Sequence, residues 1–246
     1  METQDPTISD IPRPSSLHIG AVPPSHILDL NAYPVLRPSY LLLTNSSTHR
    51  QTSPLNVADV HAAWTAADRL ESGSHGVKYM VIYNCGREAG CSRSHKHMQL
   101  FPCPPDFVLF PDRTPDECLK VPYVYELVRL DPSSSRADDT TLQIFTAYRT
   151  CLQRARAVLG IEEGEHVPHN VVLVREWILV IPRRKGRVGG VSANAAGMMG
   201  LVWVASEEEL EEWSRRGGFR LLGELGIAVG RGHNQRKTDG PAIQPP

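Results

Sequence analysis

The sequence predicts an α+β fold in which helices flank an antiparallel sheet. Apolar runs rich in β-branched and aromatic residues come in pairs that are joined by short polar or glycine-bearing connections, which is the pattern of hairpins. Two longer segments instead repeat apolar residues every three or four positions, as a helix packed on a core does. Because hairpins join antiparallel neighbours, we expect the whole sheet to be antiparallel.

The first pair of strands is expected in residues 26–44, HILDLNAYPVLRPSYLLLT. Two prolines in this segment exclude one continuous central strand, so it predicts two short strands around a connection. The next element is a helix over residues 54–72, where apolar residues have helical spacing. Asn56 is a suitable N-cap for this helix, and a Ser-Gly pair ends it.

Two further hairpin-like units follow. Residues 78–86 form a β-rich run, a glycine-bearing loop comes after it, and residues 94–102 form the second arm. Residues 138–160 have helical spacing and end at a glycine. The clearest hairpin is 169–186, HNVVLVREWILVIPRRKG, with two apolar arms around Arg-Glu-Trp, whose tryptophan we expect to pack in the core. A helix with an acidic first turn is expected later, at SEEELEEWSRR.

These elements make one domain over residues 26–228, in which a part over 26–130 carries the second hairpin-like unit and a part over 138–228 carries the third. Residues 1–25 are rich in Pro and Ser and lack apolar periodicity, so we expect a disordered N-terminal tail. The polar stretch 231–246 is expected to be a disordered C-terminal tail.

Composition excludes several classes of function. The formal net charge of −1 disfavours a general nucleic-acid-coating role, and no apolar run has the length of about 18 residues that a membrane helix needs. The N-terminus has no secretory signal, and the five cysteines are odd in number and irregularly spaced, which indicates reduced thiols. We therefore expect a cytoplasmic protein, with the nucleus as the alternative, and a monomer or weak dimer.

The segment 92–102, SRSHKHMQLFP, carries the strongest chemical signal. Side chains on a strand alternate between faces, so His95, His97 and Gln99 would lie on one face, roughly 6 to 7 Å apart. A neutral imidazole held through one nitrogen is a nucleophile through the other, and phosphorus esters are suitable electrophiles. The preceding glycine-bearing loop, NCGREAGCS, would supply backbone N–H groups to phosphates.

Spacing alone leaves other readings open. Two alternate histidines also occur as surface pairs, or as ligands of a metal site that a flanking cysteine, Cys85 or Cys91, would complete. The basic turn Arg183-Arg184-Lys185 would either hold a polyphosphate or be a solvated surface turn, and the sequence favours neither reading.

The loop and strand together resemble a known active site. Residues 84–99 follow the spacing N-x-G-x-x-x-G-[SA]-S-Q-x-H-K-H-x-Q, without a gap, that is found in fungal ATP adenylyltransferases, also called diadenosine tetraphosphate phosphorylases. The hairpin at 169–186, the following GGVSANAAGMMGLVWV and the early LNAYPVLRPSYLLLT resemble the same family. The resemblance covers about residues 26–225.

This resemblance implies a histidine-triad-like fold, akin to galactose-1-phosphate uridylyltransferases, with glutamine in place of the last histidine. It implies that His97 attacks an α-phosphate of diadenosine tetraphosphate, that ATP leaves, and that inorganic phosphate takes the AMP to give ADP. The reverse reaction makes the dinucleotide. His95 would support the nucleophile and Gln99 would contact the transferred phosphate. No covalent cofactor or resident metal is implied, although Mg²⁺ would accompany the polyphosphate.

The resemblance also implies a set of substrate-binding residues, all matched by position to the family motif. Besides Gln99, they are Asn31, Asn84, Gly90, Cys91, Ser92, Arg93, Ser192, Asn194 and Met199.

Two departures from the family pattern bear on function. Arg93 stands where the family has glutamine, and Cys91 stands where it has serine. The first 25 residues do not resemble the family's N-terminal portion, and no lysine precedes Lys78. The alternatives to a phosphorylase are therefore a hydrolase that uses water in the second step, and a catalytically weak adenine-nucleotide-binding relative with a shortened N-terminus.

Overall fold

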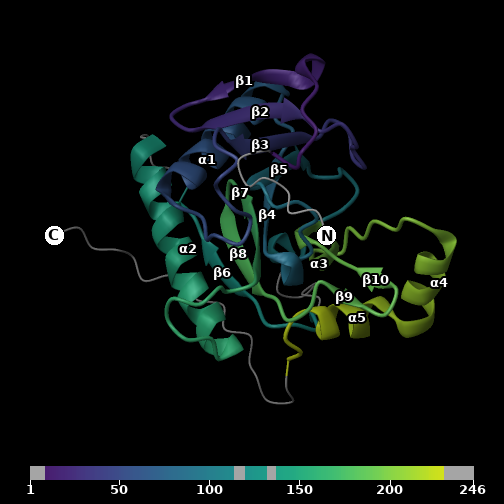
Figure 1. The fold of residues 1–246 in the computed structure, drawn as a ribbon. Helices are drawn as coiled ribbons and strands as arrows, with labels where there is room; N and C mark the ends of the chain where they lie inside the picture. Colours follow the sequence, from purple (N-terminus) through teal and green to yellow (C-terminus); the bar gives the residue numbers. More distant parts are fainter. Residues whose placement is uncertain (1–8, 114–119, 132–136, 230–246) are drawn as a thin grey trace.

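The computed structural model describes residues 9–113, 120–131 and 137–229. Within them, one sheet of eight strands has the order β1-β2-β3-β5-β4-β7-β8-β6, and each of its pairings is antiparallel (Figure 1). The predicted α+β class and antiparallel sheet are confirmed. The strands are β1 His18–Val22, β2 His26–Leu30, β3 Tyr40–Thr44, β4 Tyr79–Cys85, β5 His97–Pro102, β6 Glu126–Arg129, β7 His169–Val174 and β8 Trp177–Pro182.

The two faces of this sheet are covered by different elements. Helices α1 (Val57–Gly73) and α2 (Ala137–Leu159) lie on one face (Figure 1) and pack against alternate residues of β4 and β5, such as Val81 and Leu100. The intervening residues, such as Ile82 and Phe101, face the short helices α3 (Ala195–Met198), α4 (Glu207–Arg216) and α5 (Gly218–Leu225). Burial on both faces explains why every residue of β4 is buried.

The start of α1 follows its sequence prediction closely. The Asn56 side chain accepts a hydrogen bond from the Asp59 N–H (2.9 Å), and the Asp59 carboxylate accepts one from the Asn56 N–H (2.8 Å). This reciprocal pair is a capping box, which satisfies two backbone donors that the first turn would otherwise leave without partners.

The hairpin of β7 and β8 is confirmed with a turn one residue shorter than predicted. Trp177 pairs with Val174, so only Arg175 and Glu176 form the turn. The Trp177 side chain is fully buried, and its indole N–H donates to the Asp112 carboxylate at 2.6 Å. Trp177 therefore packs in the core, as the sequence predicted.

The predicted tail over residues 1–25 is wrong for its described part, residues 9–25. His18–Val22 forms β1 and pairs with β2, with one irregularity between His18 and Gly20. The preceding residues are anchored as well, because Asp10 accepts hydrogen bonds from Ser94 and His95 and Arg13 pairs with Asp29. Low apolar content hid this segment, in which Ile11 and Val22 are buried and hydrogen bonds hold the rest.

Several short elements were not predicted. They are β6, α3, α5 and a two-stranded ribbon of β9 (Arg187–Val188) and β10 (Val191–Ser192). Each is too short for periodicity to reveal it, so its conformation depends on the surface against which it packs. The sheet also runs through both predicted parts of the domain, since β4 pairs with β7. The predicted tail 231–246 lies outside the described residues.

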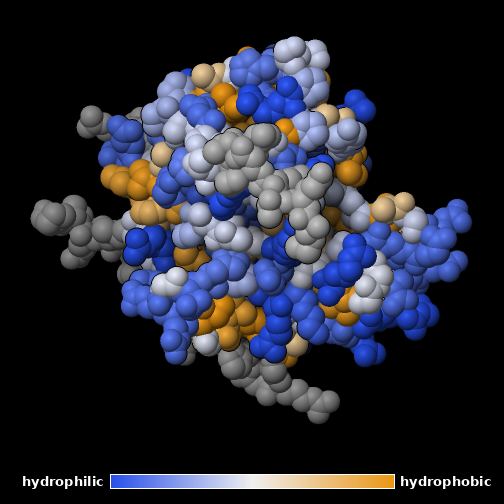
Figure 2. Space-filling model, viewed as in Figure 1, coloured by the Kyte–Doolittle hydropathy of each residue, from blue (hydrophilic) through white to orange (hydrophobic). Residues whose placement is uncertain are grey.

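The surface mixes polar and apolar residues. On the face seen in Figure 2, hydrophobic residues form small separate groups among hydrophilic ones. Among the described residues, no helix has the length and apolar character needed to cross a membrane. The four cysteines in the described ranges, Cys85, Cys91, Cys103 and Cys151, have free thiols.

Candidate active site

A cavity of about 360 Å³ opens where the loop after β2, the loop after β4, the start of β5 and the N-terminus of α3 meet. Most of the residues predicted to contact substrate line it. They are Asn31, Asn84, Gly90, Cys91, Ser92, Arg93, His97, Gln99 and Asn194. Segments that are far apart in the sequence thus contribute polar groups to one volume.

His97 is the first residue of β5, and its imidazole is held in one tautomer. The Nδ1–H donates to the carbonyl oxygen of His95 at 2.8 Å, which leaves the lone pair on Nε2. Burial is the largest cause of a lowered pKa for His97, and the nearby charge of Arg93 acts in the same direction. The ring is therefore neutral at pH 7 and can act as a nucleophile through Nε2.

The backbone of His97 is held by a residue that the sequence analysis missed. The buried amide of Gln51 accepts from the His97 N–H at 2.7 Å and donates to the His97 carbonyl at 3.0 Å. The same amide nitrogen donates to the Asn84 carbonyl at 3.0 Å. Gln51 therefore joins the end of β4 to the start of β5. No motif marked it, because a lone glutamine in a polar loop carries no spacing signal.

The prediction that His95 shares the strand face with His97 and Gln99 is correct only for the last two. His97 and Gln99 line the cavity, but β5 begins at His97. The His95 ring lies outside the cavity lining, where its Nε2–H donates to the Thr44 carbonyl (2.9 Å) and its Nδ1 accepts from the Ser9 hydroxyl (2.7 Å). Burial is the largest cause of the lowered pKa of His95. It supports His97 through its carbonyl oxygen rather than through its ring.

Asn84 is oriented by contacts on the cavity wall. Its side-chain oxygen accepts from the Asn170 amide and from the Ala195 N–H, both at 2.8 Å. Its amide nitrogen is thus the donor that remains for a ligand. On the same wall, Asn194 caps α3 by accepting from the Gly197 N–H at 3.0 Å.

Gly90 lets the loop after β4 approach this wall closely. Its φ is +81°, in the left-handed region, and a Cβ at this position would lie 2.6 Å from the carbonyl oxygen of Ala193. A side chain here would separate the loop from the segment that carries Asn194, so the glycine is required for both turn geometry and contact.

Arg183 is neither a polyphosphate ligand nor part of a solvated turn. It is fully buried, and its guanidinium donates to the carbonyls of Ala193 and Lys185, both at 2.9 Å, and to the Asn170 side chain. Burial lowers its pKa to about 10, so it remains charged at pH 7. Arg183 therefore holds the segments behind the cavity together, while its neighbours Arg184 and Lys185 are exposed.

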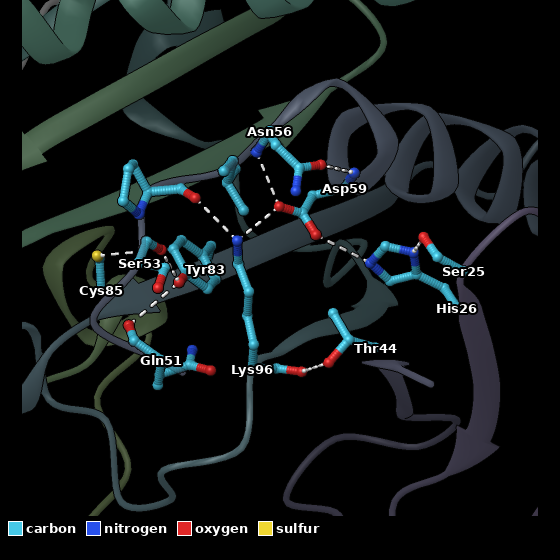
Figure 3. Close-up of polar contacts among 12 residues, drawn as sticks. Ser25, His26, Thr44, Gln51, Ser53, Asn56, Asp59, Tyr83, Cys85 and Lys96 are labelled. Atoms are coloured by element: carbon cyan, nitrogen blue, oxygen red, sulfur yellow. Dashed lines mark hydrogen bonds and ion pairs between the residues drawn. The ribbon is translucent and has the colours of Figure 1, made fainter. Parts of the chain in front are cut away.

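Lys96, between the two histidines, extends toward Asp59 of α1 (Figure 3). Its ammonium donates to the buried Asp59 carboxylate at 2.6 Å and to the Pro54 carbonyl at 2.8 Å. The other oxygen of Asp59 accepts from the His26 Nε2 at 3.0 Å. Burial works to raise the pKa of Asp59, but the hydrogen bond from His26 and the charge of Lys96 outweigh it and lower the pKa. This network ties the segment that leads into β5 to α1 and β2.

Two predicted residues do not line the cavity. Ser192 lies on β10, where it pairs with Arg187, and Met199 is buried in the apolar cluster beneath α3. Their predicted substrate contacts remain predictions. Conversely, an apolar part of the lining was not predicted, and it consists of Ile11, Pro12, Ala32, Tyr33, Val35, Leu41 and Trp203. Scattered apolar residues of loops give no sequence signal until the fold brings them together.

The alternative of a metal site formed by histidine and cysteine concerns the same region. Within residues 9–113, 120–131 and 137–229, no three His, Cys, Asp or Glu side chains lie close enough together to hold a metal ion. Burial raises the pKa of the Cys85 thiol to about 12, and burial also raises the pKa of Cys91, so both thiols are protonated at pH 7.

Two family models match the chain. One is described as the Ap4A phosphorylase N-terminal domain and matches residues 3–113; the other is described as the ATP adenylyltransferase C-terminal domain and matches residues 119–228. The prediction that the first 25 residues lack resemblance to the family is therefore wrong, because the N-terminal match begins at residue 3.

Two curated relatives come from Saccharomyces cerevisiae. Diadenosine 5',5'''-P1,P4-tetraphosphate phosphorylase 2 is 28% identical over 207 residues, which cover 74% of this chain and 63% of that protein. Protein APA1 is 29% identical over 209 residues, which cover 77% of this chain and 64% of that protein. The chain thus spans less than two thirds of the length of these relatives.

Solved structures share the fold. The crystal structure of yeast Ap4A phosphorylase Apa2 superimposes with a TM-score of 0.74 at 24% identity, over 92% of this chain and 80% of that one. The crystal structure of the same protein in complex with Ap4A has a TM-score of 0.69 at 25% identity, over 83% and 74% of the two chains.

Proposed function

We propose that this chain, which belongs to the ATP adenylyltransferase (Ap4A phosphorylase) family, phosphorolyses diadenosine tetraphosphate to ATP and ADP. The observation that carries the proposal is the neutral, single-tautomer imidazole of His97, whose Nε2 is available in a cavity lined by amides and by the loop after β4. The yeast relative that was crystallised with Ap4A supports the choice of substrate.

In the first step, the Nε2 lone pair of His97 attacks the α-phosphorus of the dinucleotide. The bond from that phosphorus to the bridging oxygen breaks, and ATP leaves with that oxygen. In the second step, an oxygen of inorganic phosphate attacks the same phosphorus, the P–N bond breaks, and ADP leaves. Attack by water would instead release AMP, which is the hydrolase alternative.

The roles of the surrounding groups follow from their hydrogen-bonding capacity. Gln99 lies on the same face of β5 as His97 and would donate its amide to an oxygen of the transferred phosphate. The amide of Asn84 and the backbone of residues 90–93 would hold the flanking phosphates. Mg²⁺ would arrive with the polyphosphate and would not need protein ligands of its own.

The apolar part of the cavity would receive an adenine base. Tyr33, Val35 and Trp203 contribute apolar surface next to the side-chain amide of Asn31, so a flat base with polar edges fits the chemistry of this end. Substitution of Trp203 by Ala would test this, with an expected loss of dinucleotide affinity at an unchanged second step.

The direct test is intact-protein mass spectrometry after brief incubation with diadenosine tetraphosphate and no phosphate. Wild type should gain the mass of one AMP, and His97→Ala should not. His75→Ala, an exposed histidine at the end of α1, is the matched control and should behave as wild type. The fate of the adduct then separates the two activities. A phosphorylase releases ADP only when phosphate is added, whereas a hydrolase releases AMP in phosphate-free buffer.

A wild-type protein that binds the dinucleotide in calorimetry but forms no adduct would refute the proposal. That result would favour the alternative of a catalytically weak nucleotide-binding relative.

A further inference from the structure

A second cavity lies against the same loop as the proposed active site. It measures about 140 Å³ and shares three lining residues with the larger cavity, Cys91, Ser92 and Arg93. The rest of its wall comes from residues 50–52, which precede α1, from Arg87 in the loop after β4, and from Ser94. The loop at 91–93 is thus a wall common to both cavities.

The second cavity is strongly cationic. Arg50, Arg87 and Arg93 line it, and no carboxylate does so among the described residues. Arg87 and Arg93 form no ion pair within the part of the chain that the structure describes. Two acids lie near this wall without lining the cavity: the Glu88 carboxylate is 4.0 Å from the His166 ring, and the Asp10 carboxylate accepts hydrogen bonds from the N–H and hydroxyl of Ser94. Like charges repel, so this arrangement favours a bound anion.

Neutral donors complete the lining. Thr52 and Ser92, whose side chains carry hydroxyls, also line the cavity. Guanidinium groups with hydroxyl donors are suited to a tetrahedral oxyanion, since arginine can bind two of its oxygens at once. The cavity, at about 140 Å³, is too small for a nucleoside, and three of its lining side chains are guanidiniums, so the ligand class is a phosphoryl group.

The second cavity is physically connected to the proposed nucleophile. Gln51 lines it and also holds the backbone of His97 through two hydrogen bonds. The charge of Arg93 acts on His97, where it helps to lower the pKa of the imidazole. An anion bound here would therefore lie next to the strand that carries the reacting group.

We infer that this cavity, with Arg87 as its distinguishing residue, is a second anion subsite that binds a phosphoryl group taking part in the transfer at His97. Two sources share this chemistry. One is the inorganic phosphate that accepts AMP, and the other is the terminal phosphate of the leaving nucleotide. The inference rests on the proposed function, because it assumes transfer through His97. It adds a site and a role for Arg87 that the active-site motif does not include.

Arg87→Gln is the informative variant because Arg87 lines only the second cavity. Arg184→Gln is the matched control, since it removes the same charge from an exposed position that lines neither cavity. Two quantities are measured for each protein. They are the KM for inorganic phosphate in phosphorolysis and the single-turnover rate of adenylyl-His97 formation without phosphate.

If inorganic phosphate is the occupant, Arg87→Gln should raise its KM by roughly tenfold or more and leave adduct formation unchanged. If the leaving polyphosphate is the occupant, adduct formation in Arg87→Gln should slow by a similar factor, and the KM for phosphate should equal that of wild type. Arg184→Gln should match wild type in both. Unchanged values for Arg87→Gln, or equal effects of the two variants, would overturn the inference.

Failure of the proposed function can be distinguished from failure of the subsite. If wild type forms no adduct, line broadening of the ³¹P signal of inorganic phosphate still measures binding directly. Broadening by wild type that Arg87→Gln removes and Arg184→Gln retains would support the subsite alone. No difference between the two variants would refute it.

Discussion

Gln51→Met is the substitution that best tests how the candidate nucleophile is held. Methionine has a similar volume, so the change removes hydrogen bonds without leaving a large cavity. The wild-type amide is 2% exposed and serves the N–H and the carbonyl of His97 and the carbonyl of Asn84. All three bonds disappear in the variant.

The expected cost follows from those three groups. An unsatisfied buried N–H costs about 1–3 kcal/mol, and a carbonyl that loses one of two partners costs less. We therefore expect Gln51→Met to reduce the free energy of unfolding by about 3 kcal/mol. Because the N–H of His97 is the group left without a partner, the start of β5 should shift, and adenylyl transfer should slow by roughly tenfold or more.

Urea unfolding measures the first quantity, and the single-turnover mass-spectrometric assay measures the second. Gln143→Met provides the matched control, because Gln143 lies on α2 and its side-chain oxygen has no hydrogen-bond partner. A Gln51→Met protein with the stability of this control and a wild-type rate of adduct formation would refute the positioning role of Gln51.

Three further predictions concern groups buried around the site. Lys96→Met should destabilise the fold by about 3 kcal/mol in urea titrations, because the Asp59 carboxylate stays buried without its ammonium partner. Adding Asp59→Asn should cost less than the sum of the single changes, and strict additivity would contradict the pair. Gly90→Ala should cost about 2 kcal/mol, since its φ is +81° and its Cβ would meet the Ala193 carbonyl, so an unchanged urea midpoint would count against this account. Stability should also fall as pH drops from 6.5 toward 4, because burial lowers the pKa of His169 from 6.5 to about 4 and the unfolded chain takes up the proton first. Proton uptake by the unfolded chain should remove up to about 3 kcal/mol of stability by pH 4, and if His169→Gln left the slope of stability against pH unchanged, the assignment would be wrong.

The sequence predicted the main elements because their signals are local. Periodicity and caps identified α1, α2 and the hairpin of β7 and β8 within a few residues of their observed bounds. The alternation in HMQLF placed His97 and Gln99 on one face of a strand, and the structure confirms it. These features could be predicted because the helices and the strand alternation depend on residues at most four positions apart, and the hairpin joins segments that follow each other directly.

The role of the N-terminal segment could not be read in the same way. Ser9 and Asp10 hold the histidine segment by hydrogen bonds to residues more than 80 positions away. Such contacts leave no periodic trace, and the composition of the segment resembles that of a disordered tail.

The sequence by itself therefore determined the chemical groups of the site and the strand that presents His97. Only the tertiary structure decided which partners hold them. Gln51 binds the backbone of His97, and the carbonyl oxygen of His95, not its ring, accepts from the Nδ1–H of His97. It also decided that Arg183 is buried while Arg87 and Arg93 face one small cavity. The physical reason is that burial and hydrogen-bond pairing depend on segments that meet only in the folded chain, whereas side-chain alternation along a strand does not.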